Sequence, residues 1–230
     1  MPIQDFIAKI AKGPKVSKDL TWDESKQVMK LLIEGQATQA QIGAFLMAMR
    51  FKMESVSELA AFTAAARAYV SPLSIPKELA VVDVPSYAGK SETFHSLIAG
   101  AIVAASVGAA IVMHGYDGIP GRPGAAGVLK ALGIPIDLDP KMAGGEVTTK
   151  KFVYLDIGMY HPPLYRFLEM RQEIGVRNLF HPVARLLNPS RAAAQVVGLS
   201  HPPHFEKTAE VLRMLGCPRA LVIRGVEGDP

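Results

Sequence analysis

The sequence predicts an α/β protein in which a small, all-helical N-terminal domain precedes a larger domain with a mainly parallel sheet flanked by helices. Three observations lead to this fold class. The first seventy residues show only helical patterns, a proline-punctuated stretch follows at 71–76, and short apolar runs then alternate with helical stretches. We therefore place the helical domain at residues 1–72 and the α/β domain at residues 77–230.

Three capping boxes mark helix starts in the N-terminal domain. In each, a serine or threonine precedes a glutamate or glutamine by three residues, at Thr21–Glu24, Thr38–Gln41 and Ser55–Glu58. Apolar residues at helical spacing follow each box, so each helix has an apolar stripe that must be covered. Alanines and methionines in the second and third helices allow close approach. We expect a homodimer formed through these N-terminal helices.

The larger domain contains short apolar runs that are typical of buried strands. The first four predicted strands are 81–84, 110–113, 134–138 and 153–155, with helices between the first three at 95–108 and 124–132. Further elements are expected at 164–174 (helix), 195–199 (strand), 204–215 (helix) and 220–223 (strand). This alternation predicts parallel strands joined by helical crossovers.

Composition argues against a disulfide-linked protein and against a secreted or membrane protein. The net charge is +4, and Cys217 is the single cysteine, so no internal disulfide can form. The N-terminus has no signal-peptide pattern, and the longest apolar stretch, 96–112, contains glycines and serines. We expect a cytoplasmic protein without a membrane partner.

Arginines are concentrated between residues 161 and 191, where five stand against two glutamates. Arginine without lysine favours bidentate contacts to phosphate or carboxylate groups. The nucleic-acid-binding candidates are Arg166, Arg171, Arg177, Arg185 and Arg191, with Lys150 and Lys151 nearby in sequence. A solvated helix face paired with the two glutamates is the alternative.

The segment VPSYAG at 84–89 lies between a predicted strand and a predicted helix, where phosphate-binding loops usually occur. Such loops contain several glycines because glycine lets backbone N–H groups approach an anion closely. This segment has a proline, a tyrosine and one glycine instead. The position therefore predicts a phosphate loop, whereas the residue types argue against one.

Several longer strings carry a family resemblance. They are LLIEGQATQAQIGAFLMAMRFKMESVSELAAF at 31–62, HG at 114–115, GVLKALGI at 127–134, HPPLYRFLEMRQEIGVRN at 161–178 and LLNPSRAAAQVVGLSHP at 186–202. Over essentially all 230 residues the chain resembles the anthranilate phosphoribosyltransferase family, which is grouped with the pyrimidine nucleoside phosphorylases. The resemblance implies the two-domain fold above. It also implies that the α/β domain is incomplete at residue 230, because the sheet of the family continues.

The resemblance allows the donor site to be compared residue by residue. The family's G-T-G-G-D loop, which binds the pyrophosphate of phosphoribosyl pyrophosphate, corresponds to Pro85-Ser86-Tyr87-Ala88-Gly89. Proline removes one N–H group, and Tyr87 adds bulk at a glycine position. The family's N-x-S-T string corresponds to 95–98, where Ser96 alone offers a hydroxyl.

The family's K-H-G-N-R motif reads Met113-His114-Gly115-Tyr116-Asp117 here, so a cation near the diphosphate is lost. Arg122 could compensate, but we favour a solvent-facing turn arginine. We therefore expect a degenerate donor site and assign no catalytic residue. Its positions are Pro85, Ser86, Tyr87, Gly89, Ser96, Met113, His114 and Gly115.

Three further residues concern ligand binding, one for the acceptor and two for a metal ion. Arg171 matches the arginine that the family directs at the anthranilate carboxylate. Glu227 and Asp229 lie near the family's Mg²⁺-binding acidic pair without reproducing it, and the six histidines lack metal-ligand spacing. We predict no metal site.

This chain resembles a divergent branch of the family that is associated with nucleic-acid binding. The resemblance lies in the pattern VPSY-G, HG and MRxxxGVRNxxH. Our first hypothesis is a degenerate transferase fold that binds nucleic acid non-specifically through its phosphates and uses no cofactor. The second is an active phosphoribosyl or glycosyl transferase with an altered substrate, in or near tryptophan biosynthesis, which would use Mg²⁺. A protein–protein scaffold is the third. Enzymatic activity therefore stays open, and the loop chemistry favours the first hypothesis.

Overall fold

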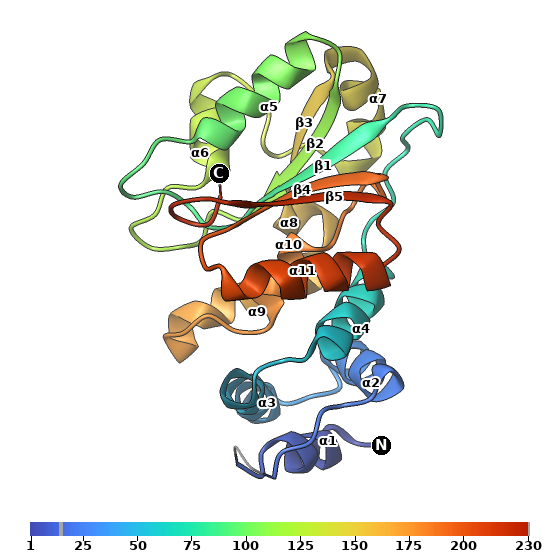
Figure 1. The fold of residues 1–230 in the computed structure, drawn as a ribbon, viewed down its shortest axis with the longest axis vertical. Coiled ribbons are helices and arrows are strands. Elements are labelled where there is room, and N and C mark those ends of the chain that lie inside the picture. The colour runs from blue at the N-terminus through green and yellow to red at the C-terminus, as the bar shows by residue number, and fades with distance from the viewer. Residues whose placement is uncertain (14–15, 230) are drawn as a thin grey trace.

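A parallel five-stranded sheet forms the centre of the larger domain in the computed structural model, which describes residues 1–13 and 16–229. Its spatial order is β3-β2-β1-β4-β5 (Figure 1). The strands are β1 (Val81–Ser86), β2 (Ala110–Gly115), β3 (Phe152–Asp156), β4 (Ala194–Leu199) and β5 (Arg219–Arg224). The predicted α/β fold class is thereby confirmed.

Helices cover the sheet and form the N-terminal domain. The N-terminal bundle contains α1 (Ile3–Ile10), α2 (Trp22–Ile33), α3 (Gln39–Lys52) and α4 (Val56–Arg67). One face of the sheet packs against α5 (Ser96–Ser106) and α6 (Ala125–Ala131), and α7 (Pro140–Lys150) packs beside β3. Between the sheet and the bundle lie α8 (Ile157–Tyr160), α9 (Pro162–Ile174), α10 (Phe180–Arg185) and α11 (Pro203–Met214) (Figure 1).

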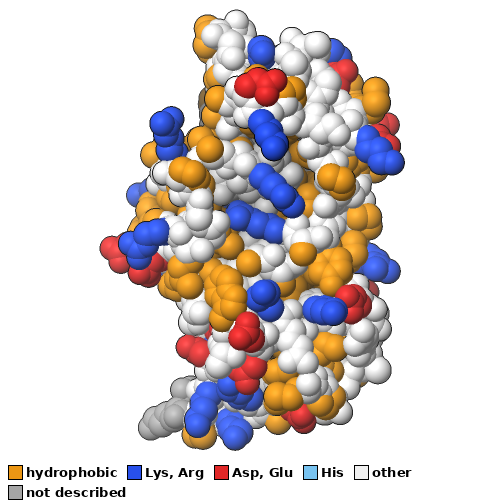
Figure 2. Space-filling view, turned by 90° about the vertical axis from the view of Figure 1, so that its right-hand side faces the viewer, with side chains coloured by type: hydrophobic (Ala, Val, Ile, Leu, Met, Phe, Trp, Pro, Cys, Tyr) orange, Lys and Arg blue, Asp and Glu red, His pale blue; other side chains and the backbone are white. Residues whose placement is uncertain are grey.

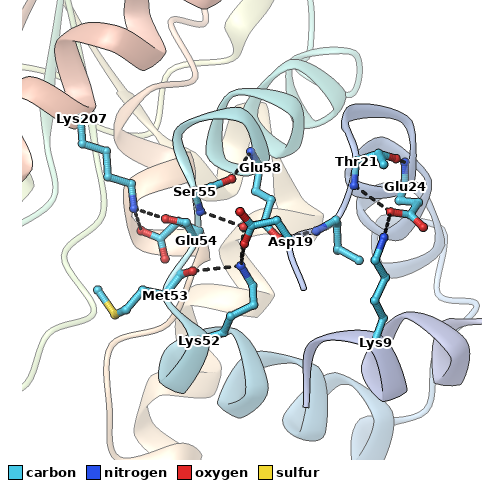
Figure 3. Close-up of polar contacts among 11 residues, drawn as sticks. Lys9, Asp19, Thr21, Glu24, Lys52, Met53, Glu54, Ser55, Glu58 and Lys207 are labelled. Atoms are coloured by element: carbon cyan, nitrogen blue, oxygen red, sulfur yellow. Dashed lines mark hydrogen bonds and ion pairs between the residues drawn. The ribbon is translucent and has the colours of Figure 1, made fainter. Parts of the chain in front are cut away.

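The three predicted capping boxes are present at the starts of α2, α3 and α4. The box of α4 is part of a buried network, because its Glu58 is fully buried (Figure 3). The Glu58 carboxylate accepts hydrogen bonds from the N–H groups of Leu20 (2.8 Å) and Ser55 (2.7 Å) and pairs with Lys52 at 2.6 Å. The capping box that satisfies N–H groups at the start of α4 thus also joins three segments of the bundle.

The bundle is fixed to the α/β domain by apolar packing and by an ion pair. A continuous apolar cluster runs from the bundle through α8–α11 to the sheet. Lys207 of α11 pairs with Glu54, in the turn after α3, at 2.9 Å (Figure 3). The bundle and the α/β domain are therefore packed together through these contacts.

The predicted strand at 134–138 is wrong. This stretch is a loop between α6 and α7, and α7 was missed at the sequence level. Pro135 has no N–H group for a sheet ladder, and Asp139 caps α7, whose first residue is Pro140. The apolar side chains of Ile134 and Ile136 pack against the cluster under α5 and α6, which explains the misleading pattern.

Strand β1 extends two residues further than expected and includes Pro85 and Ser86. Val82 and Asp83 pair with β4, whereas Pro85 and Ser86 pair with His114 and Gly115 of β2. The missing N–H of Pro85 is tolerated because β4 does not continue alongside it. In the described part of the chain, no helix is long and apolar enough to cross a membrane.

Candidate anion-binding site

The candidate site lies at the carboxyl ends of the parallel strands, the usual position of ligand sites in α/β sheets. Three segments meet there: residues 86–93 after β1, residues 116–124 after β2, and residues 225–229 after β5. Figure 1 shows the C-terminal end of the chain returning towards α6.

Six donors surround the carboxylate of Glu227. Three are the backbone N–H groups of Ser91 (2.9 Å), Glu92 (3.3 Å) and Thr93 (3.0 Å). Two are the hydroxyls of Ser91 (2.9 Å) and Thr93 (2.6 Å), and the sixth is Nη2 of Arg122 (2.8 Å). We call residues 91–93 with Arg122 the cradle. Its hydrogen bonds, led by those from Thr93 and Arg122, hold the pKa of Glu227 well below its usual range.

A second set of donors holds Asp229. Its Oδ2 accepts hydrogen bonds from the hydroxyl of Ser86 (2.6 Å) and the N–H of Ala88 (3.4 Å), and Arg185 lies 3.8 Å from Oδ1. The ammonium group of Lys90 donates to the backbone carbonyl of Asp229. Two adjoining groups of donors thus hold two carboxylates.

Glycine is required at two positions of this edge. Gly89 has a φ of +64°, and a Cβ atom there would lie 2.5 Å from the carbonyl oxygen of Arg122. A Cβ atom on Gly115 would collide with the carbonyl oxygen of Ser86 and the hydroxyl of Tyr154. Both glycines therefore let segments that are distant in sequence come together.

A buried polar network lies beneath the loop after β1. The hydroxyl of Tyr87 contacts Nδ1 of His114 (2.9 Å) and the hydroxyl of Tyr160 (2.7 Å). Nε2 of His114 lies 3.3 Å from Asp83, which also accepts a hydrogen bond from Gln195 at 2.9 Å. Burial raises the pKa of both tyrosines well above its usual value, so both remain neutral. The bulk of Tyr87 is thus directed into the core.

Arg171 of α9, Arg177 in the segment after it and Arg185 of α10 lie close to one another. The pKa of Arg177 is lowered to about 10, first by burial and then by Arg171, Arg185 and Arg122. Nη1 of Arg171 and Nε of Arg185 are buried without a hydrogen-bond partner among the described residues. A cavity of about 180 Å³ adjoins Tyr87, Arg177 and Arg185. This cleft has unused donors and net positive charge, as an anion site needs.

The structure separates the predicted basic residues into groups. Arg171, Arg177 and Arg185 come together. Arg191 precedes β4, and Lys150 and Lys151 precede β3, so these three lie near the opposite, amino ends of the strands. Arg166 is exposed on α9. The seven residues therefore do not form one surface.

Some of the predicted donor-site positions lie at the site, and others lie away from it. Pro85, Ser86, Tyr87, Gly89, His114 and Gly115 lie at or beneath the site. Ser96 is exposed at the start of α5. Met113 is fully buried in the apolar cluster beneath α5 and α6, because neighbouring strand residues face opposite sides of the sheet.

The interpretation of Arg122 as a solvent-facing turn residue is wrong. Its side chain is 28% exposed and pairs with Glu227. Sequence reasoning also missed Lys90, Ser91 and Thr93 as donors. The available signal was the run of hydroxyl residues beyond VPSYAG, which places N–H and O–H donors just before a helix.

The residues at this edge do not fit a protein-held magnesium ion. Among residues 1–13 and 16–229, no group of three or more histidine, cysteine, aspartate or glutamate side chains could hold a metal. Hydrogen-bond donors and cations engage the carboxylates of Glu227 and Asp229. Of these two carboxylates, only Oδ1 of Asp229 lacks a hydrogen-bond partner among the described residues, and the guanidinium of Arg185 lies 3.8 Å from it. Mg²⁺ needs several free oxygen ligands, which these two carboxylates do not offer.

Family models match both domains of the chain. Residues 4–70 match the glycosyl transferase family, helical bundle domain, and residues 80–229 match the glycosyl transferase family, a/b domain. Fold and site thus define a glycosyl transferase-type protein.

Relatives narrow the family further. The anthranilate phosphoribosyltransferase of Persephonella marina is 35% identical over 227 residues, covering 98% of this chain and 66% of that protein. The corresponding protein of Methanocorpusculum labreanum is 36% identical over 221 residues, covering 96% and 65%. The chain belongs to the anthranilate phosphoribosyltransferase family, as the resemblance implied, and spans slightly less than two thirds of these relatives.

Solved structures agree with this assignment. The crystal structure of anthranilate phosphoribosyltransferase from Thermus thermophilus has a TM-score of 0.86 and 28% sequence identity, covering 100% of this chain and 67% of that chain. The Saccharomyces cerevisiae protein in complex with PRPP and Mg has a TM-score of 0.83 and covers 99% and 67%. Its 17% identity bears on the fold alone.

Proposed function

We propose that this protein is a transferase of the phosphoribosyltransferase type, which binds the anionic part of its sugar donor in the cradle. The arrangement of six donors around the Glu227 carboxylate carries this proposal. Phosphate and carboxylate oxygens accept the same hydrogen bonds, and successive N–H groups of a turn form an anion-binding concavity. The amides that VPSYAG was expected to lack are supplied by the next turn.

The cleft lined by Arg177 and Arg185, with Arg171 close to Arg177, is the proposed acceptor side. Arg171 has a buried, unpartnered Nη1 among the described residues, and an arginine matches a carboxylate in charge and in planar geometry. The relatives are anthranilate phosphoribosyltransferases. An aromatic or other small carboxylate is therefore the acceptor class that we propose.

Isothermal titration calorimetry with phosphoribosyl pyrophosphate and Mg²⁺ tests the donor site. We expect saturable binding by the wild-type protein. Thr93→Val removes one hydroxyl from the cradle and should weaken binding roughly tenfold, as loss of a hydrogen bond to a charged group does. Thr149→Val is the matched control, because that hydroxyl bonds only within α7, to Gly145 and Glu146. Absence of any binding heat would refute the proposal.

The arginine cluster also supports a second candidate, non-specific nucleic-acid binding. Three arginines, 122, 171 and 185, lie close enough to Arg177 to lower its pKa, and such a cluster favours a polyanion. Elsewhere, a column of lysine and arginine side chains runs down the middle of the face in Figure 2, interspersed with hydrophobic side chains.

Mobility shifts with single-stranded and duplex DNA and with RNA test this candidate. If it holds, replacing Arg171, Arg177 and Arg185 with glutamine should weaken binding and lower the salt slope by roughly 2 to 3, about 0.9 per lost phosphate contact. Replacing Lys150, Lys151 and Arg191, near the opposite strand ends, is the matched control. If the two triple variants weaken nucleic-acid binding equally, or if no complex forms at low salt, the cleft is not a nucleic-acid site.

A further inference from the structure

We propose that residues 225–229, here the carboxylate segment, act as an internal competitor that occupies the anion site and must leave before a phosphorylated ligand binds. This inference rests on the proposed function, because it takes the cradle to be the ligand's site. It adds that the site is regulated by its own chain.

Glu227 occupies most of the donors of the cradle. Its side chain is 6% exposed, although Ser91 and Thr93 lie in an exposed turn. Six donors of the cradle point at this one carboxylate, while Nε of Arg122 is buried without a hydrogen-bond partner among the described residues. A carboxylate in such a position imitates the ligand for which the donors are suited.

Asp229 occupies a second set of donors. It is 1% exposed and uses the adjoining donors of Ser86, Ala88 and Arg185. Two carboxylates separated by Gly228 therefore occupy two adjacent anion positions. Gly228 permits this approach, since a Cβ atom there would lie 2.7 Å from that of Ala88 and its φ is +110°. Two linked anionic groups are also what a diphosphate presents.

The ligand and the carboxylate segment exclude each other because both are negatively charged and because the cradle has a limited number of donors. Each N–H group donates one strong hydrogen bond, and the cradle's amides already bond to Glu227. A phosphate bound to the same amides would lie within a few ångströms of the carboxylate, where like charges repel. The ligand and the carboxylate segment cannot use the cradle together.

The contacts of the carboxylate segment allow it to leave. Its contacts with residues 86–93, Arg122 and Arg185 are hydrogen bonds and ion pairs, whereas the side chain of Val226 is 77% exposed. The N–H of Gly225 bonds to the carbonyl of Leu199 at 2.9 Å. The segment beyond Gly225 can thus move while β4 and β5 stay paired, and its departure uncovers the small side chain of Ala88, against which Gly228 packs.

Calorimetry with inorganic pyrophosphate, in the wild-type protein and in Glu227→Gln, tests the inference. Loss of the competing charge should strengthen pyrophosphate binding by roughly tenfold or more. Glu210→Gln is the matched control, because Glu210 pairs with Arg213 on the exposed surface of α11 and should leave binding unchanged. Circular dichroism confirms that each variant is folded.

Hydrogen exchange in the wild-type protein gives an independent measurement. Saturating pyrophosphate should speed exchange of the Gly228 amide, whose hydrogen bond to Gly225 belongs to the docked segment. Two results would refute the role of the carboxylate segment as a competitor: pyrophosphate binding that is unchanged or weaker in Glu227→Gln, or Gly228 exchange that does not change on saturation. Either result would still be compatible with the proposed anion site. If no protein form binds pyrophosphate or the sugar donor, both proposals fail.

Discussion

Whether Tyr87 obstructs the loop after β1 depends on the direction of its side chain, which the residue type does not reveal. At a glycine position of the family's loop it implies an obstructed site. Its ring instead enters the core, where its hydroxyl meets His114 and Tyr160. Sequence reasoning could identify the loop and its proline, but it could not tell on which side of the backbone the tyrosine lies.

His181 makes stability depend on pH. Burial, then Arg177 and Arg171, lower the pKa of His181 to about 3. Arg185 adds to this effect, and the backbone carbonyl of Asn178 opposes it. Below about pH 6.5 the unfolded chain therefore binds a proton that the folded protein does not. The free energy of unfolding should fall as the pH falls, by up to about 1.4 kcal/mol per unit.

Urea unfolding at pH 6.5 and pH 5 checks this dependence in the wild type and in His181→Asn. The wild type should lose up to about 2 kcal/mol more than the variant over this interval. His161, whose pKa is also lowered by burial, is common to both proteins and cancels in the comparison. Equal acid sensitivity of the two proteins would contradict the assignment to His181.

At the scale of elements, local signals predicted the bundle well. The capping boxes of α2, α3 and α4 begin where the sequence placed them, because a cap depends on four neighbouring residues. The loop at 134–138 was mistaken for a strand because apolar composition alone does not separate strands from buried loops. The short helices α8 and α10 lacked a strong period and were not predicted.

The start of α4 should be sensitive to loss of Glu58. Glu58→Ala leaves the nearly buried ammonium group of Lys52 without its buried partner and two N–H groups unsatisfied. We expect a loss of about 3–5 kcal/mol in the free energy of unfolding, measured with urea. Glu210→Ala, which breaks an exposed pair on α11, should cost less than about 1 kcal/mol. Similar losses in both variants would disprove the importance of this buried network.

At the scale of the whole molecule, the contacts that define the site join distant parts of the chain. Glu227 meets Ser91 across 136 residues and Arg122 across 105. The family resemblance placed Glu227 and Asp229 near the family's Mg²⁺-binding acidic pair, but no local pattern pairs a particular carboxylate with particular amides. The same limit explains why the basic residues, adjacent in sequence, separate to opposite ends of the strands.

The predicted homodimer stays a prediction. Phe51, at the end of α3, is 79% exposed, and Met53 beyond it is 46% exposed. An exposed aromatic side chain beside the bundle is consistent with a surface that another subunit covers, and size-exclusion chromatography with light scattering measures the oligomeric state.

The most direct measurement is a crystal structure of the protein with inorganic pyrophosphate. We expect phosphate oxygens bonded to the N–H groups of Ser91, Glu92 and Thr93 and to Arg122, with the Glu227 carboxylate withdrawn. Pyrophosphate bound elsewhere while Glu227 keeps its six donors would contradict it.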